Sequence, residues 1–438
     1  MAIDDPRGAP PPLDRRAIGS WCVFDWANSP FPAVILTFVI PAYFTQAVMD
    51  DPARATSLWA MMTGIAALAI ALLSPVLGAI ADQGRARKPW LAFFTFVMAA
   101  GSLLLWFVAP DESDAALLLV LVGVTVVAFE LSMVFYNALL PNLVPSHWLG
   151  RISGWAWGLG YLGGVGGLLL VLFVFVQVET PPFGLSAAAD KLENVRMSGP
   201  VVAAWLLLFC LPLFLWTPDP RGRGLPMGKA VRTGLVEIWS TLRNLRHYPQ
   251  LWRYLLARML FTDGLNTLFA FGGVFAAGTF GMPVAEVIIF GLILNVTAGL
   301  GSFAFGWVND KIGAKRTILI GIVGIVIVGI PLLLVESKLA FFVLGSTLGI
   351  FFGPVQAASR SLMARIIPPG TESEMFGLYA LSGKATAFVG PWMVAVVTAA
   401  TGSQRWGMAT VLPFLILGGL LLWLTVRDVP PEAPVTDV

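Results

Sequence analysis

The sequence predicts an all-α membrane protein with twelve transmembrane helices arranged as two pseudo-symmetric six-helix bundles. Three observations predict this fold class. Apolar residues make up 57% of the 438 residues and charged residues only 12%, and the mean hydropathy is +0.82, far above that of soluble domains. Apolar runs long enough to cross a hydrocarbon core of roughly 30 Å recur twelve times. Short motifs of the first half of the chain also recur in the second half, in the same order.

Each of the twelve runs approaches or exceeds the roughly 20 helical residues that a bilayer core requires. The first run is the least regular, because Pro30, Pro32 and Pro41 each remove a backbone donor and clash with the preceding turn. We therefore expect a kinked or shortened first helix. The predicted spans are residues 18–49, 57–81, 90–109, 115–140, 152–176, 199–216, 251–280, 284–308, 317–335, 339–363, 375–401 and 408–426.

The basic residues predict how the chain is oriented. Loops rich in Lys and Arg stay in the cytoplasm, and most of the 27 Lys and Arg lie at the chain ends and in the loops that follow even-numbered spans. Both termini are therefore predicted to be cytoplasmic, in a multi-pass protein of a bacterial inner membrane. The predicted segments are a disordered tail at 1–17, the first bundle at 18–216, a cytoplasmic central loop at 217–250, the second bundle at 251–427 and a cytoplasmic tail at 428–438.

A polar motif, Asp-x-x-Asn-Ser/Thr, occurs twice within strongly apolar sequence. Positions i, i+3 and i+4 share one helix face, so each copy directs a carboxylate, an amide and a hydroxyl the same way at membrane depth. Ionisable residues in spanning segments nearly always face a protein interior or a water-filled cavity, and they mark substrate or proton pathways. The alternative is a set of purely structural contacts. The copies are Asp25, Asn28 and Ser29, and Asp263, Asn266 and Thr267.

Loop motifs after the second and eighth spans also match, and segment 137–145 with Gly154 and Gly160 matches 356–368 with Gly377 and Gly383. A loop Asp can accept hydrogen bonds from a neighbouring helix N-terminus, where the macrodipole favours an anion. The loop motifs therefore predict a breakable latch between conformations. Topology-setting charge alone would explain the basic residues but not the repeated Gly and Asp. The predicted latch residues are Gly78, Asp82, Arg85, Gly306, Asp310, Gly313 and Arg316.

These loops resemble those of the major facilitator superfamily, whose halves carry a Gly-x-x-x-Asp-x-x-Gly-x-basic-basic loop after the second and eighth helices. The second copy fits, and the first is one residue short between Asp82 and Gly84. Within the superfamily, segments 24–29, 135–141 and 376–384 resemble the vacuole-effluxer or "unknown major facilitator" family. The resemblance implies a secondary transporter whose two bundles rock about a central site and, for the fungal vacuolar relatives, export of amino acids.

Five ionisable residues near the middle of the predicted spans define a candidate site: Asp25, Glu130, Arg258, Asp263 and Lys384. A charge at the bilayer centre costs on the order of 3 kcal/mol, so each must be paired, solvated or used. Lys384 suits a carboxylate or phosphate, and a structural pair with Glu130 or Asp25 is an equal alternative. The predicted proton-coupling residues are Glu130, Asp25 and Asp263. The predicted substrate-binding residues are Asp25, Asn28, Glu130, Asn137, Tyr161, Arg258, Asp263, Asn266, Gln356 and Lys384.

These features favour a secondary active transporter that works by alternating access on a small polar or zwitterionic, amino-acid-like solute, with proton coupling. Glu130 is predicted to hold the cationic end of the solute and Lys384 the anionic end. The alternatives are a carrier of an amphipathic metabolite or lysolipid, and a non-transporting scaffold or sensor. The expected partners are the small-molecule substrate and the lipid bilayer, and a monomer is expected.

No enzyme activity, cofactor, metal or nucleic-acid partner is expected. The two histidines, His147 and His247, lie in predicted loops, and the sequence contains no catalytic or metal-ligand cluster.

Overall fold

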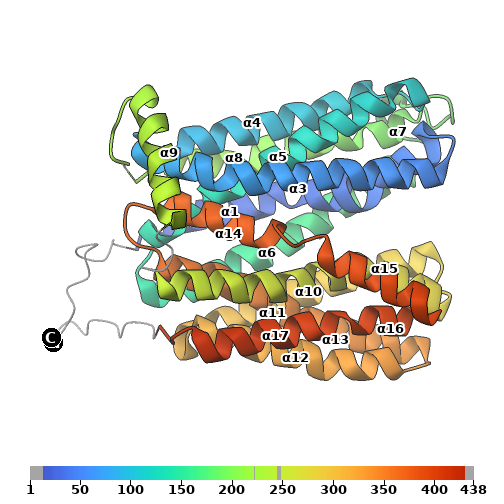
Figure 1. The fold of residues 1–438 in the computed structure, drawn as a ribbon. Coiled ribbons are helices and arrows are strands. Elements are labelled where there is room, and N and C mark those ends of the chain that lie inside the picture. Colours follow the sequence, from blue (N-terminus) through green and yellow to red (C-terminus); the bar gives the residue numbers. More distant parts are fainter. Residues whose placement is uncertain (1–12, 221, 244–247, 430–438) are drawn as a thin grey trace.

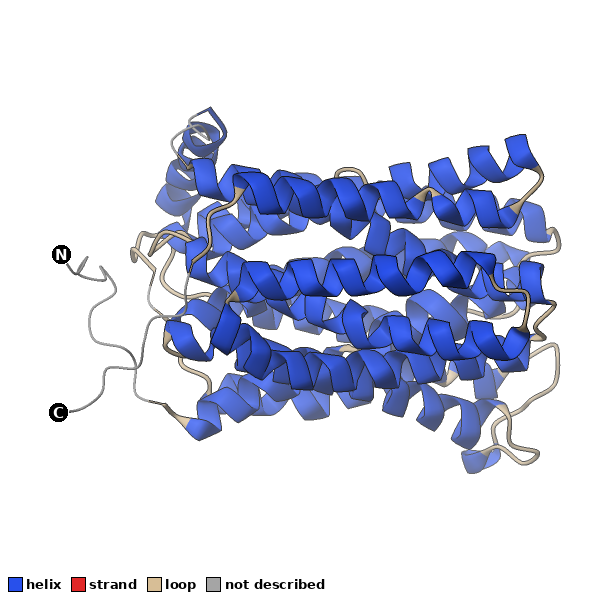
Figure 2. Ribbon diagram, turned by 90° about the horizontal axis from the view of Figure 1, so that it is seen from below, coloured by secondary structure: helices blue, strands red, loops and turns tan. Residues whose placement is uncertain are grey.

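The computed structural model describes residues 13–220, 222–243 and 248–429. Every regular element in these ranges is a helix (Figure 2). Twelve helical spans of the described residues are long and apolar enough to cross a membrane, which confirms the predicted fold class. The spans are Arg15–Val48, Pro52–Gln83, Lys88–Phe107, Glu112–Asn142, Ser146–Val176, Glu193–Trp216, Pro249–Phe280, Glu286–Ile312, Ala314–Leu334, Lys338–Ile366, Glu372–Thr401 and Gln404–Thr425.

Most helices of the first six spans lie in the upper part of Figure 1, and these spans are coloured from blue to green. The first helix starts where Asp14 caps it, because the Asp14 carboxylate accepts hydrogen bonds from the backbone N–H groups of Arg16 and Ala17. The helices of this half are α1 (Arg15–Asn28), α2 (Val39–Tyr43), α3 (Pro52–Gln83), α4 (Lys88–Leu104), α5 (Ala115–Leu139), α6 (Leu149–Val171), α7 (Glu193–Arg196) and α8 (Ser198–Trp216).

Most helices of the last six spans lie below the first half in Figure 1, coloured from yellow-green to red. The eleventh span is discontinuous, because its first helix ends at Lys384 and its second begins only at Val389. The helices of this half are α10 (Pro249–Phe280), α11 (Val284–Ile312), α12 (Ala314–Leu334), α13 (Lys338–Ile366), α14 (Glu372–Lys384), α15 (Val389–Thr401), α16 (Gln404–Ala409) and α17 (Val411–Thr425).

The first span is irregular, as its prolines predict. After α1 ends at Asn28, the chain continues through π-helical segments at Phe31–Phe38 and Phe44–Val48. Pro30, Pro32 and Pro41 lack the backbone N–H that a regular α-helix needs, so the span bends and widens there.

The chain enters the first half and leaves the second half at one end of the molecule, here called the terminal end. Ser20 Oγ, near the start of the first span, lies 2.7 Å from Thr217 Oγ1, just after the sixth. Gln250 Nε2, at the start of the seventh span, donates to the Arg427 carbonyl oxygen, just after the twelfth. A further helix, α9 (Met227–Arg243), lies across this end at a steep angle to the spans (Figure 1). The opposite end is called the far end.

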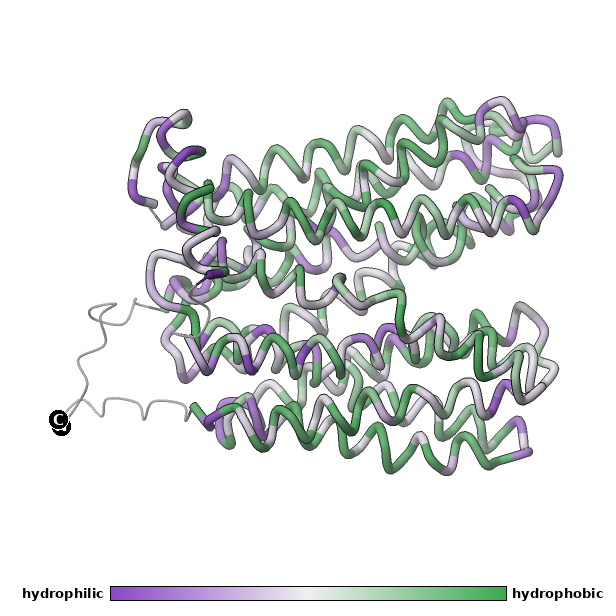
Figure 3. The backbone as a smooth tube through the Cα atoms, viewed as in Figure 1, coloured by the Kyte–Doolittle hydropathy of each residue, from purple (hydrophilic) through white to green (hydrophobic). Residues whose placement is uncertain are grey.

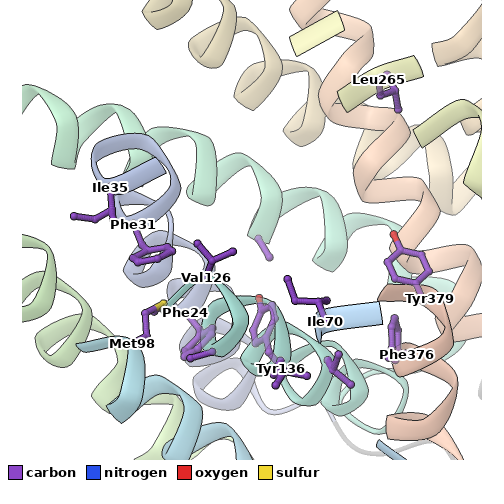
Figure 4. Close-up of a cluster of buried hydrophobic side chains, with 14 of the residues drawn as sticks. Phe24, Phe31, Ile35, Ile70, Met98, Val126, Tyr136, Leu265, Phe376 and Tyr379 are labelled. Carbon is purple, nitrogen blue, oxygen red and sulfur yellow. The ribbon is translucent and has the colours of Figure 1, made fainter. Parts of the chain in front are cut away.

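The two halves contact each other through glycines. A Cβ atom on Gly78 of α3 would lie 2.2 Å from the Ser373 carbonyl oxygen, so only glycine allows α14 to approach this closely. In the equivalent contact between α6 and α11, a Cβ on Gly154 would lie 2.9 Å from the Gly306 Cα. Figure 4 shows Phe376 of α14 beside Ile70 of α3. These repeated glycines therefore lie where the halves meet.

The central segment and the N-terminal tail contain helical residues where the sequence predicts a loop and a disordered tail. Residues 227–243 of the predicted central loop form α9, which was missed because basic residues interrupt its apolar pattern. Residues 15–17 of the predicted disordered N-terminal tail belong to α1. The predicted tails at 1–12 and 430–438 lie outside the described residues.

Hydropathy follows the membrane geometry. Hydrophobic residues dominate along the spans, and hydrophilic residues concentrate at both ends of the molecule (Figure 3). Large apolar side chains such as Phe96 and Leu424 are exposed on the outside of the spans, as a lipid environment requires.

Candidate functional site

Two carboxylates at the terminal end join the halves. The Asp82 carboxylate, at the end of α3, accepts hydrogen bonds from the start of α14, including one of 2.9 Å from Glu374 N. The Asp310 carboxylate, at the end of α11, accepts from the start of α6, including one of 2.8 Å from Gly150 N. Each carboxylate thus caps a helix of the opposite half, where the helix dipole favours an anion.

Arginines reinforce both contacts. Arg87 lies 3.0 Å from Asp82 and 2.6 Å from Glu372 of α14, so it binds one carboxylate of each half. At the other contact, Arg151 of α6 forms an ion pair with Asp310 of the opposite half. The Arg87 side chain is almost completely buried, which makes this a desolvated ion-pair network rather than a surface one.

The remaining predicted latch residues make other contacts. Arg85 is exposed, and its carbonyl oxygen accepts a hydrogen bond from Gly222 N. Arg316 pairs with Asp428 of its own half at 2.9 Å. Gly313 ends α11 with a φ of 91°, a conformation that favours glycine. The arginines that reach the opposite half are therefore not the ones that the loop pattern predicts.

Arg360 of α13 is buried among residues of the first half. Its Nη1 lies 2.9 Å from Asp25 Oδ2, which forms an ion pair between the halves. The guanidinium also donates to the Ser153 carbonyl oxygen at 2.8 Å and to Asn137 Oδ1 at 3.4 Å. It lies 4.9 Å from the centre of the Trp21 ring, within cation–π range. The second half thus inserts one positive charge into a polar and aromatic site of the first.

Sequence reasoning missed Arg360, because it lies near the end of a predicted span and close to the basic residues of the following loop. A signal was present. The offset of 223 residues that relates Gly154 to Gly377 also relates Asn137 to Arg360. The two members of this repeat therefore hydrogen-bond to each other across the halves.

Glu130 of α5 and Lys384 of α14 form a second ion pair between the halves. Lys384 Nζ lies 2.6 Å from Glu130 Oε1, and each side chain is about a quarter exposed. Lys384 is in the last turn of α14, where the helix dipole favours a cation, and the interruption of the eleventh span follows it directly. The sequence leaves Glu130 and Asp25 open as partners of Lys384, and in the structure the partner is Glu130.

A cavity of about 260 Å³ runs from Asp25 towards the far end. Its polar lining includes Asp25, Asn28 and Asn295, and Asn28 Nδ2 lies 3.2 Å from Met133 Sδ. Its other walls are largely apolar and aromatic, contributed by Met133, Phe129, Trp157, Tyr161, Phe38 and Phe269. Three of the predicted substrate-binding residues, Asp25, Asn28 and Tyr161, therefore line it.

A second chamber of about 230 Å³ adjoins the first. The two share Thr37, Phe38, Phe269, Gly291 and Asn295 as lining residues. The second chamber continues among α10, α11 and α13, and its walls are mostly apolar. The combined space has a polar floor at the Asp25 end and an apolar body.

Arg258 packs within its own half instead of facing this space. It donates hydrogen bonds to the Tyr379 carbonyl oxygen at 2.7 Å and to Ser382 Oγ at 2.8 Å, and its guanidinium lies 3.4 Å from the centre of the Tyr379 ring. These contacts hold α10 against α14. In this conformation Arg258 therefore contacts its own half and lines neither chamber.

The second copy of the buried motif also differs from the prediction. Asp263 is buried and faces the start of α15, where a Cβ on Gly390 would lie 3.2 Å from Asp263 Oδ1. The interruption of the eleventh span exposes a helix N-terminus there, which favours an anion. Neither Asp263 nor Asn266 lines either chamber. Gln356 is half-buried and does not line either chamber.

A family model described as vacuole effluxer Atg22 like matches residues 52–429. The chain belongs to this family. The "Uncharacterized MFS-type transporter YxiO" of Bacillus subtilis is 28% identical to it over 424 residues, which cover 96% of each chain. "Autophagy-related protein 22" of Cryptococcus neoformans is 25% identical over 287 residues, or 61% of this chain. The match spans about half, 48%, of that fungal relative.

Solved structures show the same fold. The major facilitator transporter FucP in the outward conformation superposes with a TM-score of 0.72 at 15% identity, covering 94% of this chain and 98% of FucP. The proton:xylose symporter XylE gives 0.70 at 13% identity, covering 95% and 96%. The predicted major facilitator fold is confirmed, and the chain is a major facilitator transporter of the Atg22-like family.

Proposed function

We propose that this transporter works by alternating access and carries a zwitterionic, amino-acid-like solute with an apolar side chain. The observation that supports this proposal is the ion pair between Asp25 and Arg360. Asp25 lines the cavity, and Arg360 comes from the opposite half. A solute that competes for Asp25 therefore acts directly on a contact that holds the halves together.

A zwitterion can replace both charges of this pair. Its ammonium group would bind Asp25 and its carboxylate would bind Arg360, so neither buried charge is left without a partner. Once the direct ion pair is replaced, one of the contacts that hold the halves together is removed, and the latch contacts at Asp82 and Asp310 remain to be broken. Binding then shifts the conformational equilibrium because the solute contacts the two states differently.

The rest of the cavity suits an apolar side chain. Phe129, Trp157 and Phe269 provide aromatic walls, and the volume of about 260 Å³ fits a small organic molecule. A solute with many hydroxyl groups would leave them without partners on these walls, at a cost in binding free energy.

Proton coupling is proposed at the second ion pair. Protonation of Glu130 removes its negative charge and with it the attraction to Lys384 of the other half. Acidification on the side to which Glu130 is accessible would therefore loosen the halves, while the deprotonated carboxylate favours their closure. Asp82 and Asp310 are proposed to act as the latch that breaks and re-forms in each cycle.

Counterflow in proteoliposomes tests the proposal. We expect preloaded leucine to drive uptake of labelled leucine, whereas isoamylamine, which lacks the carboxylate, and leucinamide, which has no negative charge, do not. Arg360→Met should abolish counterflow, while the exposed control Arg54→Met should retain it. Glu130→Gln should flatten the dependence of the rate on pH. Unchanged leucine counterflow in Arg360→Met would disprove this assignment.

A second candidate substrate, an amphipathic metabolite or lysolipid, is supported by the second chamber and its apolar walls. An acyl chain longer than a leucine side chain would extend from the first chamber past Phe269 into the second. Binding of lysophospholipids with acyl chains of increasing length separates the two candidates. Binding that strengthens with chain length favours the lipid, and selective binding of free amino acids favours the zwitterion.

A further inference from the structure

A groove of about 530 Å³ opens on the surface at the terminal end, between α9, α10 and α14. It lies between parts of the molecule that belong to different halves. Helix α9 packs on α3 of the first half, whereas α10 and α14 belong to the second. A molecule bound in this groove would therefore contact both halves.

The chemistry of the groove changes with depth. Arg243, the last residue of α9, and Trp252, in the first turn of α10, line its outer part. Leu256, Met259 and Leu381 line its inner part. Met259 lies ten residues from the start of α10, which corresponds to a depth of about 15 Å along the helix. Tryptophan and arginine favour the headgroup level of a bilayer, and the aliphatic residues favour its hydrocarbon.

The orientation of α9 places it at the surface of the membrane. The helix lies across the terminal end at a steep angle to the spans (Figure 1). It exposes large apolar side chains, including Leu235 and Trp239, together with the basic residues Lys229 and Arg232. This combination is typical of helices that lie in the headgroup region of an anionic leaflet.

Helix α9 is fixed to the end of α3 that carries Asp82. A Cβ on Gly234 would lie 2.8 Å from Ile80 N, so the helix touches the backbone of α3. Glu237 accepts a hydrogen bond from Gln83 Nε2 and forms an ion pair with Arg223 at 3.0 Å. The position of α9 is therefore tied to the position of the α3 terminus.

We propose that this groove binds one anionic glycerophospholipid of the leaflet at the terminal end. The phosphate group of the lipid pairs with Arg243, and the glycerol backbone of the lipid lies at the level of Trp252. One acyl chain packs along Leu256, Met259 and Leu381. The net negative charge of the headgroup complements Arg243, the basic residue that lines the groove, whereas a zwitterionic headgroup carries its own cation. The bound lipid joins α9 to α10 and α14 and so favours closure of the terminal end. This site is separate from the proposed solute site.

Native mass spectrometry of the purified full-length protein tests the proposal directly. The protein is titrated with phosphatidylglycerol and, separately, with phosphatidylcholine of identical acyl chains. We expect one phosphatidylglycerol to be retained in preference to phosphatidylcholine and to raise the melting temperature more. Arg243→Ala should weaken the retention by about fivefold, the contribution of one basic residue near an anionic surface. Leu256→Trp, which fills the groove without changing charge, should weaken it too.

The matched control is Arg232→Ala, which removes the same charge from an exposed position of α9 that does not line the groove. We expect its retention of phosphatidylglycerol to stay close to that of the unaltered protein. Equal retention of the two lipids, or an equal loss in Arg232→Ala and Arg243→Ala, would show general surface attraction and would overturn the site. Melting temperatures without added lipid identify any variant that is misfolded, and Leu256→Trp then tests the groove independently of Arg243.

Discussion

Arg360 is a charged residue whose hydrogen-bond and ion-pair partners in the described part of the chain come from the other half of the molecule. Its guanidinium is almost completely buried and binds Asp25, Asn137 and Ser153. Loss of one member of a buried ion pair leaves the other charge without compensation, which costs about 3–5 kcal/mol. Loss of both members removes the charges together and costs less.

A double-mutant cycle measures this coupling. Arg360→Met should lower the free energy of unfolding by about 3 kcal/mol, and Asp25→Asn should also be destabilising. The double variant should be more stable than the sum of the two losses predicts, with a coupling energy of about 1–3 kcal/mol. Thermal unfolding in one detergent provides the comparison. Additive losses would mean that the two side chains do not act as a pair.

The sequence reveals isolated charges better than charges near loops. Asp25, Glu130 and Lys384 stand out because each interrupts a long apolar run, and two of them form an ion pair with each other. Arg360 does not stand out, because Arg365 follows it in the same helix and a basic residue at a span end is normally explained by topology. Only its place in the internal repeat distinguishes it.

At the scale of helices, close approach of α3 to α14 depends on small residues. Gly78→Val should hold these helices apart, because even its Cβ would lie 2.2 Å from the Ser373 carbonyl oxygen. We expect the terminal end to open. Spin labels at the exposed positions Arg85 and Arg316 should then lie farther apart, which electron–electron distance measurement would detect.

The matched control is Gly64→Val in the same helix, where a Cβ meets no atom within 4 Å. This control should leave the distance between the labels unchanged. If both variants gave the distance of the unaltered protein, the tight contact at Gly78 would not limit closure.

The sequence predicts the helices that cross the membrane but not the departures from regular helix. Twelve spans follow from apolar length, which the bilayer imposes directly. The gap between α14 and α15 does not follow, although Gly383, Gly390 and Pro391 flank it, because glycine and proline also occur within continuous spanning helices. Lys384 lies at the end of α14 and Asp263 lies beside the start of α15, and such tertiary neighbours are not visible in a local pattern.

At the scale of the whole molecule, the orientation in the membrane is a prediction that labelling can check. In a background with Cys22→Ser and Cys210→Ser, cysteines at the exposed positions Ser113 and Ser337 should react with an impermeant maleimide added to intact cells. A cysteine at Arg85 should react only after the cells are opened. The opposite pattern would place the terminal end outside the cell.

The distribution of ion pairs between the halves makes the two ends of the carrier unequal. Within the described ranges, the ion pairs that join the halves lie at the terminal end or at mid-depth, whereas the far-end pairs Arg54–Glu112 and Lys338–Glu286 each lie inside one half. An empty carrier would then spend most of its time with its terminal side shut. A solute arriving from that side can bind only the small fraction of carriers that are open to it. Its apparent dissociation constant is the intrinsic dissociation constant divided by that fraction. The same binding residues would thus show weaker apparent affinity from one compartment than from the other.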